Sequence, residues 1–280
     1  MKNIYFARHS DGIGLEGIGA MAQYQIICYI LSKVYGVKFY FEGFKNVAHY
    51  QHFNADPTEW DSDFNKFFNF PTTIDTTLQE INHSDIKQPL ADFINENDNV
   101  KITFDNGHYL LNFLDNYIDD LTVQSICTEL KNNIFLEKEK IYFDTNDTNI
   151  AFHIRVPTAV DIIVEPNLNP KREMFDDSKT PEILEKLKYV DRTIDLPNKV
   201  YHIYSQGQES DFEFLKQSNL NIKLHIEEYV PISLYHMINC DVLIAANSSM
   251  SWIAHILGNQ KFSFVRNTFF NRWRSSSIIV

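Results

Sequence analysis

Hydrophobic positions at the start of the chain follow the order strand, helix, strand. Residues 3–7 form an apolar run of strand length, and residues 20–35 carry apolar side chains at helical spacing. Gly36 is a typical helix end, and residues 37–41 form a second apolar run. A strand that returns through a helix to a second strand makes a parallel pair, so this pattern predicts a parallel sheet.

The rest of the N-terminal half is polar and aromatic, and its pattern is weaker. It predicts helices over residues 58–68 and 85–95, a strand over 100–104 and a helical region over 109–131. Residues 45–98 as a whole are typical of insertions and lids on a first domain.

Alternating strands and helices return in the second half, after the polar stretch "FDTNDTN" at 143–149. We place the domain boundary there, giving domains 1–145 and 146–280. The alternation predicts a second parallel α/β domain. Its expected strands are 150–155, 200–204, 222–226, 242–246 and 261–265, and its expected helices are 181–190, 210–217, 232–239 and 249–257.

Charge and composition narrow the class of protein. The 280 residues carry a formal net charge of −12, which argues against a nucleic-acid binder, because such binding is driven by clustered Lys and Arg. The three cysteines lie far apart, so neither a disulfide framework nor a cysteine metal site is indicated. No window holds the ~18 apolar residues of a membrane span, and the start lacks the apolar core of a secretory signal. We therefore expect a soluble cytoplasmic protein, in a bacterial or virus-infected cytosol.

The stretch "DGIGLEGIGA" at 11–20 has the G-x-G-x-x-G spacing of a dinucleotide-binding loop. Four residues separate Gly12 from the preceding strand, and the carboxylates of Asp11 and Glu16 would repel a pyrophosphate. An acceptor-side role fits better: Gly17 and Gly19 allow close approach of a ligand to the backbone, and Glu16 is placed to act as a general base. Asp75, on the acceptor side, and Asp105 are alternative bases.

An anion site is expected in the second half. His153 and Arg155 stand two residues apart at the end of a buried strand, so they share a face at the strand's carboxyl end, where parallel sheets bind ligands. A guanidinium offers bidentate hydrogen bonds to a diphosphate and stabilises a leaving group without a metal. An ion pair with a loop acid such as Asp161 is the alternative.

The segment "CDVLIAANSSMSWIAHIL" at 240–257 is the second anchor of this site. After its strand, Asn247, Ser248, Ser249 and Ser251 surround the start of a helix, where N–H groups and hydroxyls can bind phosphate. Simple capping of that helix by Asn247 or Ser248 is the alternative.

Two metal-site patterns were weighed. Asp61 and Asp63 have D-x-D spacing, but residues 58–61 resemble a capping box, so helix-start acids are favoured. His49, His52 and Asp56 have zinc-ligand spacing if helical, yet isolated His pairs are more often surface residues. We expect no metal and no cofactor.

Four short motifs resemble those of the inverting fucosyltransferase superfamily: "GIGAMAQY" at 17–24, "HIR" at 153–155, "YSQGQESDF" at 204–212 and the segment at 240–257. The resemblance implies a GT-B fold, with two Rossmann-like α/β domains facing across a cleft, the nucleotide sugar on the C-terminal one and the glycan acceptor mainly on the N-terminal one. It implies contact of Arg155 with the diphosphate, phosphate binding by Ser248 and Ser249, and a place for Ser205 in the nucleotide pocket. In one branch a Glu of the glycine loop is thought to be the base, and Glu16 resembles it in position.

Two departures from the family pattern bear on the donor. Ala20 stands where Asn-Gln is usual after the glycines, and Val156-Pro157 replaces the residues that commonly follow H-x-R. The sequence thus predicts an inverting, metal-independent glycosyltransferase, with GDP-fucose as donor by resemblance and UDP-xylose or another sugar nucleotide as alternatives. Two other functions stay open: a non-catalytic glycan-binding module of the same fold, and an NAD(P)-dependent oxidoreductase that uses the glycine loop.

Overall fold

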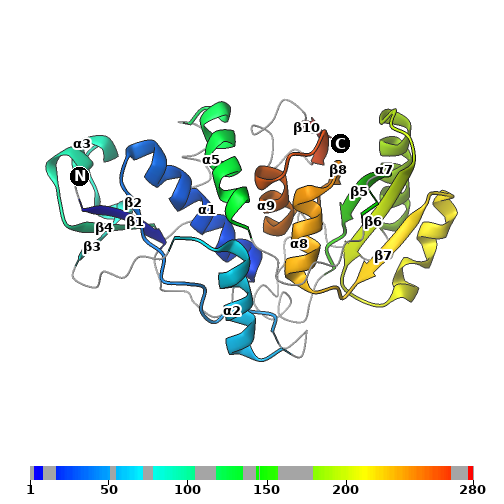
Figure 1. Cartoon of the computed structure of the whole chain (residues 1–280), viewed down its shortest axis with the longest axis horizontal. Coiled ribbons are helices and arrows are strands. Elements are labelled where there is room, and N and C mark those ends of the chain that lie inside the picture. The colour runs from blue at the N-terminus through cyan, green and yellow to red at the C-terminus, as the bar shows by residue number, and fades with distance from the viewer. Residues whose placement is uncertain are drawn as a thin grey trace. The chain divides into compact units, whose positions relative to one another are not determined.

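The chain forms two compact units, Met1–Phe135 and Leu136–Val280 (Figure 1). The computed structural model describes residues 3–8, 17–50, 55–71, 78–104, 118–134, 143–144, 146–156, 179–265 and 277–279. The division falls before the polar stretch 143–149 at which the sequence placed the domain boundary.

The N-terminal unit contains a parallel sheet with the strand order β2-β1-β4-β3. Its central strand β1 pairs with β4 over five residues, from Ile4 opposite Val100 to Arg8 opposite Phe104. Ile4 and Phe6 are fully buried, as expected of a strand covered on its faces. The strands are β1 (Ile4–Arg8), β2 (Lys38–Phe39), β3 (Gln79–Asn82) and β4 (Val100–Phe104).

Helix α1 (Ile18–Tyr35) makes the crossover between β1 and β2 and packs on both strands. It ends at Gly36, which has a φ of 65° and so occupies the left-handed region that glycine tolerates best. Helix α5 packs on α1, where Glu129 accepts hydrogen bonds from Tyr29 and Lys33. The helices of this unit are α1, α2 (Pro57–Phe68), α3 (Leu90–Glu96), α5 (Asp120–Asn133) and the 3₁₀ turn η1 (His83–Asp85).

The start of α2 differs from the predicted capping box at residues 58–61. The cap is Asp56, whose carboxylate accepts the N–H groups of Thr58 and Glu59 at 2.8 and 3.1 Å, and Pro57 occupies the first helical position. Asp followed by Pro matches the preferences of these two positions, since proline lacks the N–H that would go unused there. The buried face of the helix carries Trp60, Phe64, Phe67 and Phe68.

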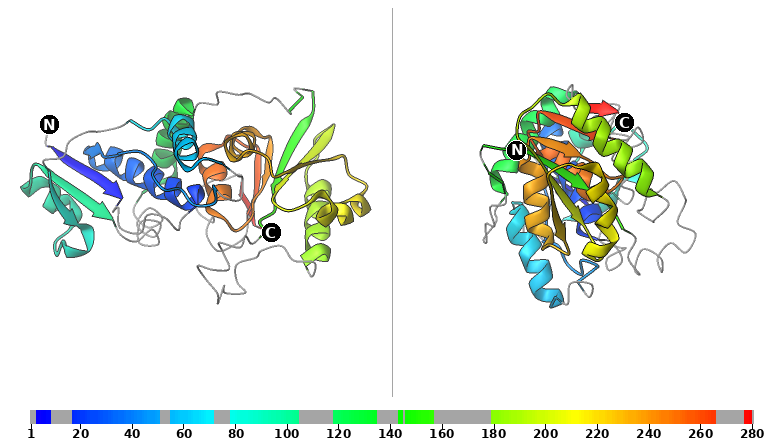
Figure 2. Two further views of the ribbon diagram at one scale, coloured as in Figure 1. Left: turned by 90° about the horizontal axis from the view of Figure 1, so that it is seen from below. Right: turned by 90° about the vertical axis from the view of Figure 1, so that its right-hand side faces the viewer.

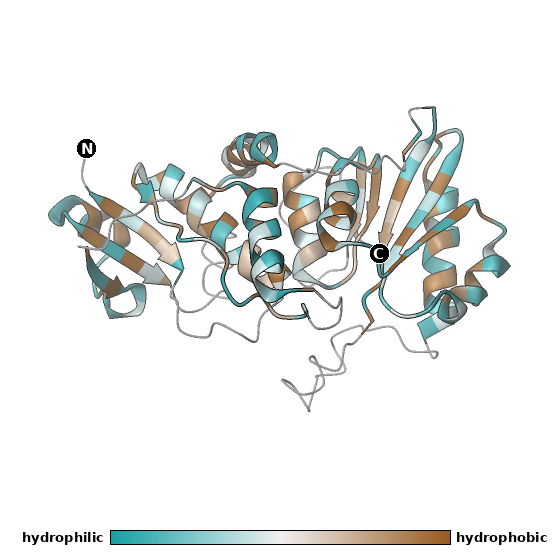
Figure 3. Ribbon diagram, turned by 60° about the horizontal axis from the view of Figure 1, so that its bottom comes forward, coloured by the Kyte–Doolittle hydropathy of each residue, from teal (hydrophilic) through white to brown (hydrophobic). Residues whose placement is uncertain are grey.

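The C-terminal unit contains a six-stranded parallel sheet with the order β10-β9-β8-β5-β6-β7. Its strands carry long hydrophobic stretches (Figure 3). The strands are β5 (Thr148–His153), β6 (Lys199–Ser205), β7 (Ile222–Ile226), β8 (Val242–Ile244), β9 (Phe262–Val265) and β10 (Ser277–Ile279). Two parallel-sheet α/β units, the building blocks of the predicted GT-B fold, are thus present.

Helices cover both faces of this sheet (Figure 2). On one face, Ile150 and Ile203 pack with apolar side chains of α7 and η3. On the other face, side chains of β6 meet α8, where the rings of Tyr204 and His236 lie 6.1 Å apart. The elements are α7 (Thr180–Thr193), η3 (Glu209–Ser218), α8 (Val230–Asn239) and α9 (Ser249–Leu257).

Three expectations from the pattern require correction. Residues 210–217 lie in a 3₁₀ helix, η3, whose tighter turn the apolar spacing does not distinguish from an α-helix. The predicted helix 85–95 is shorter in the structure: Asp85 ends η1, residues 86–89 lie in neither helix, and α3 begins at Leu90 after its N-cap Pro89. Strand β3 was not predicted. Among the described residues, no helix is both long and apolar enough to cross a membrane.

Candidate functional site

The order of strands reverses at β5 in the C-terminal unit. The chain runs outward from β5 to β6 and β7, then returns to β8 on the other side of β5 and continues to β9 and β10. In parallel α/β sheets, ligands bind outside the carboxyl ends of the strands at such a reversal. Here the carboxyl ends of β5 and β8 carry His153 and the turn that leads into α9.

His153 joins these two strand ends through its Nδ1 atom. The hydroxyl oxygen of Ser251 lies 2.8 Å from Nδ1, and that of Ser248 lies 3.2 Å from it. Ser251 Oγ also accepts the N–H of Ala246 at 3.0 Å, and Ser248 Oγ accepts the N–H of Ser251 at 3.2 Å. Each hydroxyl keeps its own hydrogen, so Ser251, the closer of the two, can donate to Nδ1 when the ring carries its proton on Nε2.

The His153 imidazole is neutral at physiological pH. Burial and, secondarily, the charge of Arg155 lower its pKa from 6.5 to about 3. Arg155 follows two residues later and is partly exposed. The positive charge at this strand end thus belongs to the guanidinium, while the histidine supplies a neutral N–H donor.

The turn before α9 combines capping with an anion-binding geometry. Ser248 is the N-cap, with extended backbone at φ −147° and ψ 151°, so the capping alternative weighed for this residue is realised. N–H groups in the first turn of a helix have no intrahelical acceptor, and this end carries a partial positive charge. Asn247 and Ser249 flank the cap and are partly exposed.

The hydroxyls of Ser251 and Ser205, two of the predicted donor-site residues, bond to groups of the strand ends. Ser251 is completely buried, and its hydroxyl is engaged by Ala246 and His153. Ser205, at the end of β6, donates its hydroxyl to the carbonyl of Ile154 at 2.7 Å. That bond fixes the backbone directly before Arg155. In this arrangement both serines hold the strand ends in place.

The acceptor-side residues fall partly outside the described structure. Glu16 and Asp75 lie outside it, as do Gly12 and Gly14. Gly17 is the N-cap of α1, and a Cβ at this position would lie 2.8 Å from Cδ2 of His49, closer than van der Waals contact allows. A side chain at position 17 would therefore require the His49 ring to move.

Gly19 lies in the first turn of α1, in the N-terminal unit, and is partly exposed. Nothing else in the described structure distinguishes it, so its place on the acceptor side stays a prediction.

Two residues of the metal-site patterns, Asp61 and Asp56, have structural roles. Asp61 lies on α2 and accepts the N–H groups of Asn46 and Val47 at 2.7 and 2.9 Å. Asp56 caps the same helix, and His52 lies outside the described residues. No group of three or more His, Cys, Asp or Glu side chains in the described part of the chain is placed to hold a metal ion.

A chain of buried polar groups, which the sequence pattern does not indicate, lies on the face of the sheet that meets α8. Asn149 donates its amide to the carbonyls of Asp144 and Asp147, so its Oδ1 must accept from Nε2 of His202 at 3.2 Å. His202 Nδ1 then accepts from Nε2 of His225 at 2.9 Å. Each histidine sits among apolar residues of a strand, and this sequence context alone does not reveal the pairing.

No family model matches the sequence, and a search of curated proteins found no match. The solved structures similar to this chain include POFUT1 in complex with GDP-fucose, at 10% identity and a TM-score of 0.42, covering 92% of this chain and 95% of that chain. They also include the E. coli heptosyltransferase WaaC with ADP-2-deoxy-2-fluoro heptose, at 9% identity and a TM-score of 0.40, covering 100% of this chain and 93% of that chain. At these identities the likeness concerns the fold alone.

Proposed function

We propose that this protein is an inverting, metal-independent glycosyltransferase that takes a sugar from a nucleoside diphosphate sugar and transfers it to a glycan hydroxyl. The observation that carries the proposal is the cluster of His153, Ser248 and Ser251 beside Arg155, at the strand-order reversal and the start of α9. It combines a guanidinium, a neutral imidazole and a helix N-terminus at one strand end, which is the chemistry that binds a diphosphate.

Arg155 would hold the diphosphate and neutralise the charge that develops as the bond from the sugar to the phosphate oxygen breaks. The first turn of α9 would bind the phosphate through backbone N–H groups and the hydroxyls of Ser248 and Ser249, with Asn247 alongside. His153 would donate from Nε2. These hydrogen-bonding groups would already be in position before the sugar nucleotide binds, so they would need no reorganisation during the reaction.

A carboxylate must complete the reaction on the acceptor side. An acceptor hydroxyl attacks the anomeric carbon from the face opposite the diphosphate, the bond to the leaving oxygen breaks, and the configuration inverts. A general base takes the proton of the attacking hydroxyl. We assign this role to Glu16 first and to Asp75 second, with Gly17 and Gly19 at the acceptor side.

The donor is proposed from the motif resemblance as GDP-fucose, with UDP-xylose or another sugar nucleotide as the alternative. Thermal unfolding with a panel of GDP, UDP and dTDP sugars in EDTA tests this. A ligand at about one hundred times its Kd stabilises the fold by about 2.7 kcal/mol, a shift of several degrees. The absence of a shift with every nucleoside diphosphate would remove the basis of the proposal.

Arg155→Ala separates a transferase from a non-catalytic glycan-binding module. A transferase should lose activity by about two orders of magnitude or more, because a leaving-group contact acts in the transition state. A module that only binds glycans should bind them unchanged. Arg192→Ala is the matched control, because Arg192 is an exposed arginine on α7 of the same unit.

A further inference from the structure

Hydrogen bonds join the carboxyl ends of β5, β6 and β7 into one edge of the C-terminal sheet. Ser205, the last residue of β6, donates its hydroxyl to the carbonyl of Ile154 at 2.7 Å. The carbonyl of Ser205 accepts the N–H of Glu227, the residue after β7, at 3.1 Å. The carboxylate of Glu227 in turn accepts the N–H of Gly207 at 2.7 Å. The backbone that follows β6 is thus tied to β7 on one side and to the residue before Arg155 on the other.

Glu227 has an unusual backbone conformation for a glutamate. Its φ is 54°, in the left-handed region that residues with a Cβ rarely adopt. Seven non-glycine residues in the described parts of the chain have a positive φ, and five of them are asparagine, whose short polar side chain tolerates this region. Glutamate lacks this advantage, and what it supplies instead is the carboxylate that reaches Gly207. Strained backbone persists only where the surrounding structure holds it, and it gathers at ligand sites.

The segment that Glu227 holds, residues 205–208, is named here the β6 loop. Its Gly207 has a φ of 111°, and a Cβ at that position would lie 2.8 Å from Oδ2 of Asp211. The same oxygen accepts the N–H of Gln208 at 2.8 Å. The loop is therefore tied to β7 by one carboxylate and to η3 by another. It nevertheless stays partly or fully exposed, so its fixed backbone is accessible to a ligand.

The place of the β6 loop indicates which part of a nucleotide it would meet. Strands β5 and β6 are neighbours, paired from Thr148 opposite Lys199 to His153 opposite Tyr204, and α7 makes the crossover between them. In doubly wound parallel sheets, the ribose of a nucleotide lies at the carboxyl end of the strand next to the one that binds its pyrophosphate. With a diphosphate at the end of β5, the β6 loop is therefore the place for the nucleoside.

We propose that Glu227 is a positioning residue of the donor site: by fixing the β6 loop, it shapes the surface on which the nucleoside of the donor binds. The inference rests on the proposed function, because it concerns the same nucleotide. Glu227 acts through the backbone N–H and carbonyl groups of the loop. Its own backbone bond to Ser205 survives a side-chain substitution, so Arg155 should keep its place when the carboxylate is removed.

Calorimetric titration of the full chain in EDTA tests the proposal. The probes are GDP and UDP, of which the one that the parent chain binds is followed, and pyrophosphate, which lacks a nucleoside. Glu227→Gly removes the carboxylate and introduces the residue that adopts a positive φ without strain. We expect it to weaken nucleotide binding about fivefold or more, because a loop that is no longer fixed must be ordered by the ligand. Pyrophosphate binding, measured by competition with the nucleotide, should stay within about twofold.

Matched variants separate positioning of the loop from support of the fold. Glu227→Gln keeps a side-chain oxygen that can accept the N–H of Gly207, so it should restore the nucleotide affinity to within about twofold of the parent. Glu185→Gln removes an exposed carboxylate on α7 of the same unit and should change neither affinity. Thermal unfolding should give Glu227→Gly a melting temperature no lower than that of the parent, because glycine relieves the backbone strain.

The outcomes distinguish this proposal from the proposed function. A nucleotide affinity that is unchanged in Glu227→Gly would overturn the role of Glu227 and leave the donor site standing. An equal loss of nucleotide and pyrophosphate affinity would likewise overturn the assignment of the β6 loop to the nucleoside. A parent chain that binds neither GDP nor UDP would reject the proposed function, and the role of Glu227 with it.

Discussion

Acidification should destabilise the C-terminal unit well above the pH at which carboxylates protonate. Burial, with smaller charge effects from neighbouring groups, lowers the pKa of His202 to about 3 and that of His225 to about 4, against 6.5 in the unfolded chain. Because the folded pKa values are lowered, the unfolded chain binds more protons below pH 6.5. The contribution of the two neutral rings to the free energy of unfolding is therefore fully present above pH 6.5, and it is lost as the pH drops toward 4.

The size of this loss follows from the two pKa differences. At pH 5 an unfolded histidine is almost fully protonated, while both buried rings are neutral. Each ring therefore lowers the free energy of unfolding by about 2 kcal/mol relative to its value at neutral pH. The pair lowers the free energy of unfolding by about 4 kcal/mol, a large part of the stability of a typical domain, and the neutral ring of His153, whose pKa is lowered to about 3, adds a loss of similar size per ring. His202 can bind no proton at Nδ1 without losing the hydrogen bond that it accepts from His225.

Urea unfolding followed by circular dichroism between pH 7.5 and 5 measures this loss. His225→Gln keeps an N–H donor for His202 but cannot titrate, so it should recover about 2 kcal/mol of the loss at pH 5. A free energy of unfolding that stays constant from pH 6.5 to 5 would refute the reasoning. So would a His225→Gln variant whose free energy of unfolding falls with pH as steeply as that of the parent.

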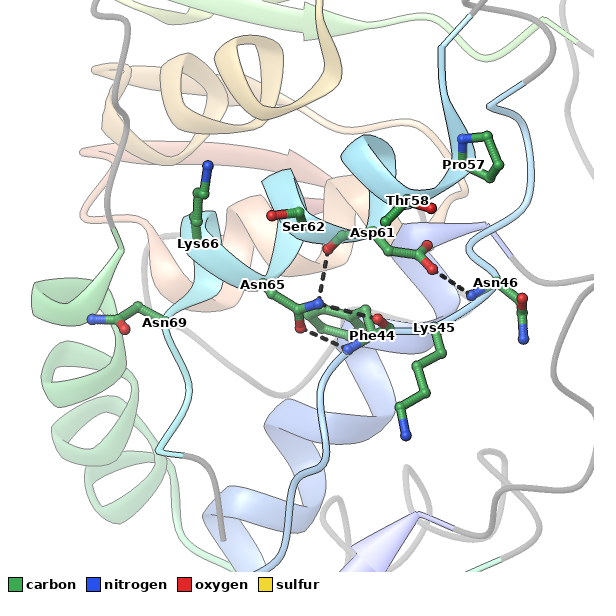
Figure 4. Close-up of a pocket in the computed structure, with 10 residues that line it drawn as sticks. All are labelled: Phe44, Lys45, Asn46, Pro57, Thr58, Asp61, Ser62, Asn65, Lys66 and Asn69. Atoms are coloured by element: carbon green, nitrogen blue, oxygen red, sulfur yellow. Dashed lines mark hydrogen bonds between the residues drawn. The ribbon is translucent and has the colours of Figure 1, made fainter. Parts of the chain in front are cut away.

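Three further predictions concern the N-terminal unit and are checked by thermal or urea unfolding. Gly17→Ala places a Cβ 2.8 Å from Cδ2 of His49 and should lower the free energy of unfolding by about 1–3 kcal/mol. Adding His49→Ala to this variant should restore part of the loss, and the absence of any rescue would argue against this contact. Asn65→Ala removes the side-chain hydrogen bonds to the N–H and the carbonyl of Phe44 (Figure 4) and should lower the free energy of unfolding by about 1–3 kcal/mol. Lys66→Ala, at the neighbouring exposed position, should change it by no more than about 0.5 kcal/mol, and equal effects would contradict a stabilising role of Asn65. Asp56→Ala removes the cap of α2 and should cost about 1 kcal/mol, and a neutral result would place the helix start elsewhere.

Strongly periodic segments were predictable from the sequence almost to the residue. Strands β4 and β7 and helix α9 have the bounds that the apolar pattern predicts, because each buries a continuous or regularly spaced apolar set. Strand β3 escaped prediction because Gln79 and Glu80 are exposed at the edge of the sheet, where burial imposes no apolar pattern. The start of α2 was misplaced although Asp56 and Pro57 carry the stronger capping signal.

Parts of the proposed donor site could be predicted from the sequence, and parts could not. The carboxyl end of β5 and the start of α9 follow from the alternation of strands and helices. The contact between His153 and Ser251, which are 98 positions apart, needed the strand order, in which β5 and β8 are neighbours. The internal engagement of Ser205 and Ser251 could not be inferred, because a hydroxyl serves a backbone carbonyl or a ligand equally well.

Calorimetric titration with GDP, and with UDP in parallel, in the presence of EDTA tests the central claim most directly. One of the two nucleotides should bind at one site per chain without a metal. Arg155→Ala should weaken this binding about tenfold or more, while Arg192→Ala leaves it unchanged. Binding of neither nucleotide, or equal binding by the parent and Arg155→Ala, would contradict a donor site at the carboxyl end of β5.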